Sequence, residues 1–547
     1  MFRENNEHQQ ERLFSPIKEL PSGPRTKLDD HWSSHFYEHV FTQIDETKFA
    51  DLFHDGYSRP NKPVNELVSL EIIKHTCGYS DEELEYAYLF DLTVRNALGK
   101  ELLNDNICTN TFTNFRRRLL EYEEETGRNL LGEVFDEHCT YFIEEFDITA
   151  ETQRMDSTFI EANIKQLSRI DLVAKVLHNF LGDLPEEVLE ELPTEIQEFT
   201  EIENLNLSYR LAPGEAETKL ETLAEQAAQL YERFEDDERF TQLQSFDHLQ
   251  RVLVEQCYRI PELEDDMDAE SDGEHTDDDD DDEYPGWKPV RNRGSNTSDG
   301  AVDESDAVET EETEEPTDAD RVGLKDPDDI DSGSLQNPHD EEATYRRKNG
   351  EHHYGYKANL AETCGSDDLF RLITCVQVKT NNTEDTEFLE EGIEELAATT
   401  GLQELLTDGG YLGEEAEAIC DEADVSQHFS GIKGRRPDPD AVSVADAEWD
   451  GHELVACPAG QAPFEQAYTP DNERYWGRFD KSLCGNCPYQ EQCFVEERQE
   501  FYSYGFYERT LVTARRRAKL ADPEFREFLN QRAGAESMIN EMFGVLY

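Results

Sequence analysis

An acidic low-complexity segment, residues 262–331, limits how much of this chain can enter a packed core. It holds 30 Asp and Glu residues against 5 Lys and Arg, a net charge of −25, and includes six consecutive aspartates at 277–282. Such a segment buries too little apolar surface to offset the conformational entropy that ordering costs. We therefore expect residues 262–340 to form a disordered acidic linker, with order resuming near Tyr345.

The acid excess extends beyond this segment. The chain of 547 residues has a formal net charge of −76, of which −51 remains outside the segment, and it contains 33 arginines and only 17 lysines. A surface of this kind is typical of proteins that work at molar salt, where the Debye length falls to about 3 Å and repulsion is screened. We expect a halophilic, haloarchaeal host. At such salt the acidity of the chain does not exclude DNA binding, because long-range repulsion is screened and local contacts determine whether DNA binds.

Targeting signals and cysteine usage indicate the compartment. The sequence contains no run of 18 apolar residues, and its N-terminus has no apolar signal segment, so we expect neither a membrane span nor secretion. Eleven cysteines in a long, unsecreted chain do not indicate a disulfide framework. We expect a cytoplasmic protein.

Hydrophobic periodicity predicts the domains. The pattern is helical over 31–150, where Ser80 and Glu83 form a capping-box motif, and it changes to a strand near 152–160. After the acidic segment, residues 351–432 predict the order β–β–α–β–α–β, which indicates a mixed α/β sheet. The expected parts are a flexible N-terminus (1–30), a helical N-terminal domain (31–150), and a catalytic domain (151–547) that is interrupted by a helical insertion (165–260), the linker (262–340) and a Cys-rich insertion (440–500).

Two aspartates stand out because they lie within or directly after predicted strands. Asp156 lies in RMDSTFI, and Asp408 follows the apolar strand of LLTDGGY and precedes two glycines, which allow a ligand to approach the backbone closely. Carboxylates at strand ends can hold two Mg²⁺ or Mn²⁺ ions for phosphoryl transfer. Glu536, on the last predicted helix, is the candidate third ligand, and Glu541 is the alternative. Each acid alone is more often a cap or turn residue.

Four blocks of the chain, in order, resemble DDE-type insertion-sequence transposases. RMDSTFIEANI resembles the first-aspartate strand of that family, SLQNPHDEEATYRRKNGEHHYGYKANLAETC its signature block, LLTDGGYLGEEAE its second-aspartate segment, and RAGAESMIN its glutamate helix. RPNKPVNELVSLEII, YSDEELEYAYLFDLTVRNALG and TFTNFRRRL resemble the helical domain that precedes the catalytic core. The resemblance implies an RNase H-like fold in which Asp156, Asp408 and Glu536 are the catalytic metal ligands.

The resemblance also implies a function. The protein would bind the terminal inverted repeats of an insertion sequence, cleave DNA and transfer the 3′-hydroxyl ends to target DNA, working as a homodimer on paired ends. Two alternatives stay open: a metal-dependent nuclease without strand transfer, and a truncated relic that retains DNA binding only. The truncated relic is considered because the chain ends 11 residues after Glu536. A purely acidic scaffold conflicts with the ordered pattern after residue 345.

Cys457, Cys484, Cys487 and Cys493 have the spacing C-x26-C-x2-C-x5-C in a loop-rich region. A C-x-x-C pair with two further thiolates is what tetrahedral Zn²⁺ requires, so we consider a structural zinc site. Reduced cysteines beneath a loop, or a redox pair, are the alternatives.

Clustered cations are the third feature, because they contrast with the acidity of the chain. Arginine binds phosphates through paired hydrogen bonds, so such clusters are candidates for DNA contacts, with internal ion pairs as the alternative. His352 or His353 could serve as a base, but a metal-activated nucleophile removes that need. The candidate DNA-binding residues are Arg116, Arg117, Arg346, Arg347, Lys348, Lys357, Arg515, Arg516 and Arg532, and Lys433, Arg435 and Arg436 form a further cluster.

Overall fold

The computed structural model describes residues 2–9, 17, 19–53, 60–100, 106–201, 207, 215–260, 321–348, 350–365, 368–432 and 438–544. The chain is mixed α/β, and its contacts divide it into two compact units. The first unit comprises residues 1–157, 359–377 and 384–547, and the second comprises residues 158–358 and 378–383. No helix among the described residues is both long enough and apolar enough to cross a membrane.

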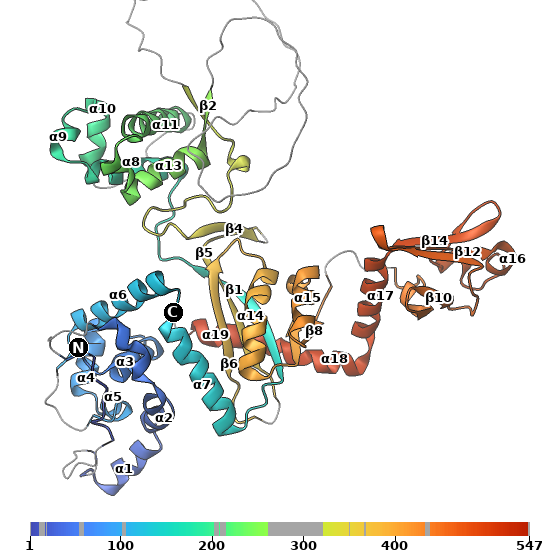
Figure 1. Cartoon of the computed structure of the whole chain (residues 1–547), viewed down its shortest axis with the longest axis horizontal. Helices are drawn as coiled ribbons and strands as arrows, with labels where there is room; N and C mark the ends of the chain where they lie inside the picture. The colour runs from blue at the N-terminus through green and yellow to red at the C-terminus, as the bar shows by residue number, and fades with distance from the viewer. Residues whose placement is uncertain are drawn as a thin grey trace, which may run out of the picture. The chain divides into compact units, whose positions relative to one another are not determined.

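The N-terminal part of the first unit is all-helical, as the sequence predicts (Figure 1). Its apolar residues form one core, which includes Phe41, Leu70, Leu84 and Phe112. The predicted capping box of Ser80 and Glu83 is confirmed. The helices are α1 (Ser22–Asp29), α2 (Trp32–His39), α3 (Val64–Cys77), α4 (Asp81–Phe90), α5 (Leu92–Ala97), α6 (Thr109–Thr126) and α7 (Leu130–Phe146).

The described part of the N-terminus, for which we expect flexibility over residues 1–30, contains a helix and a buried contact. Residues 22–29 form α1, and Asn5 is buried, with its backbone N–H donating to a carboxylate oxygen of Glu46 at 2.7 Å. Glu46 in turn accepts hydrogen bonds at the start of α3, so this polar stretch is fixed by a buried carboxylate rather than by apolar residues. Polarity alone does not reveal such a contact.

A six-stranded sheet has the order β4-β5-β1-β7-β8, with β6 paired to β5. Strands β1, β5 and β6 contribute residues to both units. The predicted order β–β–α–β–α–β is confirmed for β5, β6, α14, β7, α15 and β8. The bounds are β1 (Thr152–Glu161), β4 (Thr344–Lys348), β5 (Glu351–Thr363), β6 (Ile373–Thr380), α14 (Asp385–Thr400), β7 (Glu404–Thr407), α15 (Glu414–Glu422) and β8 (Ser426–Phe429).

Within the first unit, alternation along the strands gives this sheet two packed faces. Met155 and Leu405 point to one face, where they join the buried apolar residues of α14 and α15. Leu406 and Cys364 point to the other face and contact Leu529 of α18 (Pro523–Leu529). After α18 the chain continues through a 3₁₀ segment, η10 (Asn530–Gly534), into α19 (Ala535–Gly544).

The Cys-rich insertion folds as a small β module with its own core, rather than as loops alone. Its buried residues include Leu454, Tyr475, Phe479, Tyr502 and Tyr504. A four-stranded sheet has the order β11-β12-β14-β13, and β9 pairs with β10. The elements are β9 (Glu448–Asp450), β10 (Glu453–Ala456), β11 (Glu465–Thr469), β12 (Arg474–Asp480), α16 (Lys481–Cys484), β13 (Glu496–Glu497), β14 (Phe501–Tyr507) and α17 (Glu508–Ala521).

The second unit contains the helical insertion, whose amphipathic helices share one core. The helices are α8 (Arg169–Asp183), α9 (Glu186–Leu189), α10 (Thr194–Gln197), α11 (Glu215–Phe234), α12 (Glu238–Thr241) and α13 (Gln244–Gln256).

Order returns earlier than the expected linker boundary near Tyr345. Strand β3 (Arg321–Leu324) pairs antiparallel with β2 (Cys257–Ile260), and Val322 is buried in the helical core. Leu335 is buried in the same core. These apolar residues explain the correction, because their burial orders a stretch that composition alone places in the linker. Residues 261–320 lie outside the described residues.

Candidate active site

Asp156 and Asp408 lie at matching positions of neighbouring parallel strands. The register pairs Arg154 of β1 with Leu406 of β7, and each aspartate follows its strand's paired residue by two positions. Because side chains alternate along a strand, both aspartates are expected on the face to which Arg154 and Leu406 point. The strands therefore place two carboxylates side by side.

Local hydrogen bonds hold each carboxylate in place. Asp408 caps the 3₁₀ turn η6 (Gly409–Tyr411), where its Oδ1 accepts the backbone N–H of Gly410 at 2.6 Å. The Oδ1 of Asp156 accepts the backbone N–H of Ser157 at 3.0 Å. In each aspartate the second oxygen, Oδ2, faces a cation of the chain itself.

That cation is Arg532 of η10. Its Nη2 lies 3.1 Å from Oδ2 of Asp156 and 4.0 Å from Oδ2 of Asp408. The guanidinium thus bridges the two carboxylates, and its Nε has no hydrogen-bond partner among the described residues. The sequence singled out Arg532 as a candidate for contacting DNA. The structure places it within the pair of acids.

A third acid, Asp385, lies beside this pair and is not among the residues that the sequence predicted. It is the first residue of α14, and its Oδ1 accepts the hydroxyl of Ser157 at 2.6 Å. A methyl group added to Gly410 would come within 2.4 Å of Oδ2 of Asp385, so the carboxylate also lies against the turn that follows Asp408. No local pattern distinguishes Asp385 from the other acids of this chain.

The pKa values of the groups in this site show that the three carboxylates repel one another. The pKa of the Asp156 carboxyl is raised, first by burial and then by the charges of Asp408 and Asp385, although Arg532 opposes the shift. The pKa of the buried Tyr411 hydroxyl is raised well above its ordinary value, by burial and by the same three carboxylates. A partly buried site with mutually repelling carboxylates is typical of functional centres.

Arg154 positions the segment that carries Arg532. It is buried, its Nε donates to Oε2 of Glu362 at 2.8 Å, and its Nη1 donates to the carbonyl oxygen of Gln531 at 2.7 Å. The backbone at Gly534 passes so close that an added methyl group would lie 2.0 Å from this guanidinium. Glycine is therefore required at position 534 for the close approach.

Glu536, the predicted third metal ligand, is exposed in the first turn of α19. It lies four residues after Arg532, about one helical turn along the chain. Within the described ranges, no three His, Cys, Asp or Glu side chains are grouped so that they could hold a metal ion. The structure therefore brings together Asp156 and Asp408, and the role of Glu536, like that of Glu541, stays a prediction.

The four cysteines of the predicted zinc site line one cavity of about 170 Å³ in the β module. All four are free thiols. The pKa of Cys484 is raised to about 11, first by burial and then by Cys457, Cys493 and Cys487. The four sulfur atoms are thus close enough that their thiolate charges would repel one another. In this conformation, however, they are not arranged around one point at which a metal ion could be held.

The candidate DNA-binding cations of the N-terminal helices are largely used inside the protein. Arg116 forms ion pairs with Glu71 at 3.0 Å and with Asp81 at 2.6 Å, and its hydrogen bond to Asp81 lowers the pKa of that carboxyl. Arg117 pairs with Glu121 one helical turn away. For Arg116 the structure favours the alternative interpretation, internal ion pairing, whereas the pair of Arg117 is exposed and weak.

The candidates of the second unit lie on β4 and β5. Arg347 is exposed, and the ammonium of Lys348, also exposed, lies 5.3 Å from the ring centroid of Phe159. Arg346 donates to backbone carbonyls of residues 381–383, and Lys357 is buried and donates to the carbonyl oxygen of Thr383 at 3.0 Å. Arg347 and Lys348 therefore remain the better placed for an external phosphate.

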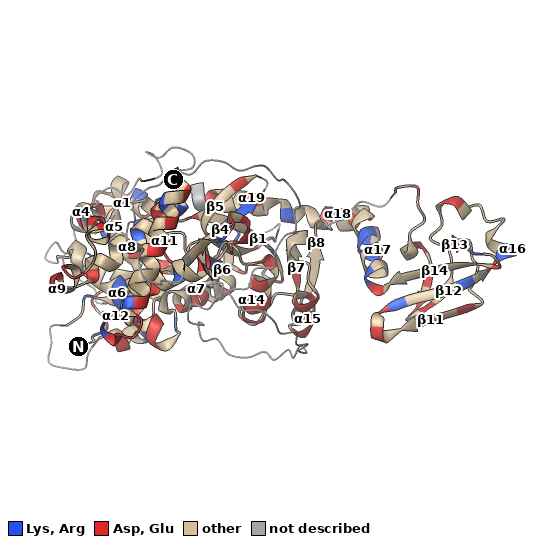
Figure 2. Cartoon of the chain, turned by 90° about the horizontal axis from the view of Figure 1, so that it is seen from above, with Lys and Arg blue, Asp and Glu red and all other residues tan. Residues whose placement is uncertain are grey.

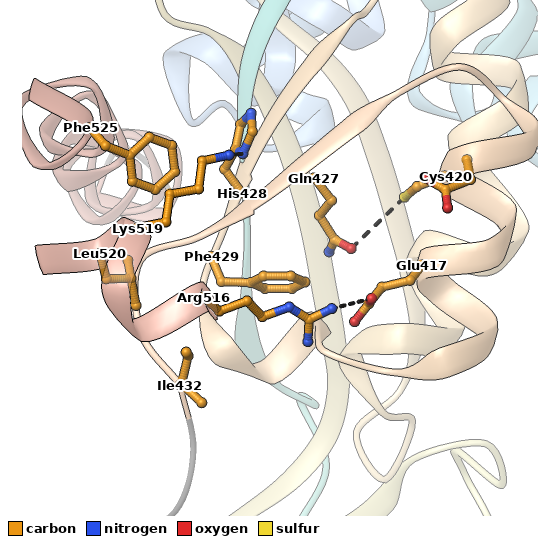
Figure 3. A pocket seen from close by; sticks show the side chains of 11 residues that line it. Glu417, Cys420, Gln427, His428, Phe429, Ile432, Arg516, Lys519, Leu520 and Phe525 are labelled. Carbon is orange, nitrogen blue, oxygen red and sulfur yellow. Dashed lines mark hydrogen bonds and ion pairs between the residues drawn. The ribbon is translucent and has the colours of Figure 1, made fainter. Parts of the chain in front are cut away.

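Helix α17 presents Arg515 to solvent, whereas Arg516 lines a pocket of about 220 Å³ with Lys519 of the same helix (Figure 3). The guanidinium of Arg516 forms an ion pair with Glu417 and lies 5.4 Å from the ring centroid of Phe429. Arg516 thus links α17 to α15 and β8. The cluster Lys433, Arg435 and Arg436 lies outside the described residues.

Comparison with known proteins gives one match. Residues 26–118 match the family model described as "Transposase domain (DUF772)". This region coincides with the N-terminal helices whose blocks resemble the domain that precedes a transposase core. The match supports a transposase-like function, and hence DNA as a partner. No curated protein and no solved structure matches the chain.

Proposed function

We propose that the chain is a DDE-type transposase with an RNase H-like core, which cleaves DNA at the terminal inverted repeats of an insertion sequence and transfers the 3′-hydroxyl ends to target DNA. The observation that carries the proposal is the convergence of Asp156 and Asp408 at matching positions of β1 and β7, bridged by Arg532. The transposase match of residues 26–118 supports it independently.

The carboxylates fit Mg²⁺ or Mn²⁺ as donors. Asp156 and Asp408 offer their Oδ2 atoms on one side of the sheet, and hard divalent cations prefer such oxygens. Asp385 and Glu536 are the candidates for a third carboxylate. When bound, two such ions activate a water or a 3′-hydroxyl and stabilise the leaving oxygen.

The residues of the chain have distinct roles in this proposal. Asp156 and Asp408 hold the ions, and Ser157 orients Asp385 through its hydroxyl. Arg532 balances the two negative charges before ions bind, and its guanidinium is then available to contact the phosphate that is cleaved. Tyr411, whose hydroxyl donates to Asn359 at 2.6 Å and whose pKa is raised, stays protonated beside the acids.

Two ends must be joined in concert, so we propose a homodimer on paired ends.

The test of the proposed cleavage and joining uses the full chain, Mg²⁺ and labelled duplexes with the inverted repeats that flank its gene, in a series of KCl concentrations up to molar. We expect cut ends and, with pre-cut ends and a target plasmid, joined products on a gel. Cut products that are never joined support the nuclease instead, and binding without cutting supports the relic.

We also propose a structural Zn²⁺ held by Cys457, Cys484, Cys487 and Cys493, because all four line one cavity of a module with a small core. Rotation of the thiols into the cavity would bring them around the ion. We expect about one zinc per chain by elemental mass spectrometry. The double variant Cys484→Ser/Cys487→Ser should lose the metal, whereas Cys77→Ser, an exposed cysteine of α3, should keep it. Equal zinc in both variants would contradict the proposal.

A further inference from the structure

The four-stranded sheet of the β module has one buried and one outward face. Tyr475, Phe479, Tyr502 and Tyr504 point into the core and are at most 4% exposed. The residues that alternate with them must point the other way. The outward face, called here the arginine–aromatic face, carries Arg474, Trp476, Arg478 and Asp480 from β12, Phe501, Ser503, Gly505 and Tyr507 from β14, Glu465, Ala467 and Thr469 from β11, and Glu496 from β13.

Arginine side chains lie over aromatic rings across this face. The guanidinium of Arg478 lies 4.7 Å from the ring centroid of Phe501 and 5.4 Å from that of Trp476. Tyr507 lies beneath two cations, Arg474 at 5.7 Å and Arg509, the second residue of α17, at 5.1 Å. These contacts place guanidinium groups beside aromatic rings across the face.

Trp476 has small neighbours on both adjacent strands. The register pairs it with Ala467 of β11 and with Gly505 of β14. No bulky side chain therefore stands beside the indole ring at the paired positions of the two neighbouring strands. An aromatic ring flanked in this way offers a flat surface on which another ring can stack.

The face carries the acids Glu465, Asp480 and Glu496 beside its arginines. Arg478 pairs with Glu465 at 2.8 Å, but in the described part of the chain neither Arg474 nor Arg509 has an ion pair with a carboxylate. Figure 2 shows basic segments along β12 and on α17. Arg474 and Arg509, which lie over the ring of Tyr507 and have no carboxylate partner in the described part of the chain, are therefore the cations of this region that are available to an anionic partner.

We propose that the arginine–aromatic face binds single-stranded DNA, with a base stacked on Trp476 and phosphates held by Arg474 and Arg478. A flat aromatic surface needs unpaired bases, which a duplex does not present. The two arginines are four residues apart on one strand, roughly 13 Å, so they can contact different phosphates of one DNA strand. The proposal rests on the proposed function only for the source of the strand, the opened ends of cleaved DNA.

The test measures the affinity of the full chain for a labelled single-stranded oligothymidylate by fluorescence anisotropy over a series of KCl concentrations. Arg474→Ala/Arg478→Ala should weaken binding at least about tenfold and flatten the slope of log K against log salt by roughly 1.4, since two phosphate contacts are lost. Trp476→Leu should weaken binding about tenfold, and Trp476→Phe much less, because phenylalanine keeps a stacking ring. Arg233→Ala, an exposed arginine of α11, is the matched control.

Unchanged affinity in the arginine double variant, or equal losses for Trp476→Leu and Trp476→Phe, would refute the proposal. It would also be wrong if the variants weakened binding of a blunt duplex as much as that of the single strand. Circular dichroism and thermal melting establish that each variant is folded. The readout is independent of cleavage, so a wild-type chain that binds this oligonucleotide but never cuts DNA would count against the proposed function alone.

Discussion

We expect Asp156→Asn to abolish the proposed DNA cleavage, with a loss of at least about a thousandfold, or roughly 4 kcal/mol of transition-state stabilisation. The reason is geometric, since Asp156 and Asp408 supply the two carboxylates that β1 and β7 bring together. An amide of the same shape keeps the packing but cannot hold a divalent cation in the same way. Asp408→Asn should have an effect of the same size in the same gel assay.

The matched control is Asp424→Asn, an exposed position with φ 59°, a backbone conformation that asparagine also adopts readily. This variant should cleave at the wild-type rate. Cleavage retained within about tenfold in either Asp156→Asn or Asp408→Asn, with Mg²⁺ at saturation, would show that the chemistry lies elsewhere.

The same substitution at Asp156 should stabilise the fold. Its pKa is raised in the folded chain, mainly by burial, so the folded state holds the proton more tightly than the unfolded state. Stability from this group is therefore present below the unfolded pKa and is lost as the pH rises through the folded pKa. At neutral pH the ionised carboxylate destabilises the fold, so Asp156→Asn should melt at a higher temperature than the wild type, with a smaller difference at acidic pH.

We expect Arg154→Ala to lower the unfolding free energy of the protein by about 3–5 kcal/mol, because it leaves the carboxylate of Glu362 buried without its charge partner. It also removes the donor to the carbonyl of Gln531, which fixes the segment that carries Arg532. We expect a clear fall in melting temperature together with weaker cleavage. Differential scanning calorimetry and the gel assay measure the two effects.

The double variant Arg154→Met/Glu362→Leu separates the charge from the packing. Replacing a buried ion pair by apolar side chains of similar size is often nearly neutral for stability, so this variant should recover most of the lost melting temperature. Cleavage should remain weak, because the carbonyl of Gln531 still lacks its donor. A single Arg154→Ala variant that melts like the wild type would show that the pair does not support the sheet.

Much of the fold follows from patterns that extend over a few residues. Ser80 with Glu83 predicts a helix start, and the β–β–α–β–α–β order over 351–432 follows from alternation and helical spacing. The sequence pattern fails where a few apolar contacts order a polar stretch. Val322 and Leu335 lie in a segment whose composition indicates disorder, yet both are buried in the core of the helical insertion.

For the site, the sequence alone determined that Asp156 lies within a strand and Asp408 directly after one, because apolar runs and glycines mark these positions locally. Only the tertiary structure decided which other side chains meet them. Asp385 reaches the site through Ser157, 228 residues away along the chain, and Arg532 reaches Asp156 across 376 residues. Such contacts depend on how helices pack against both faces of the sheet, and no local pattern contains that information.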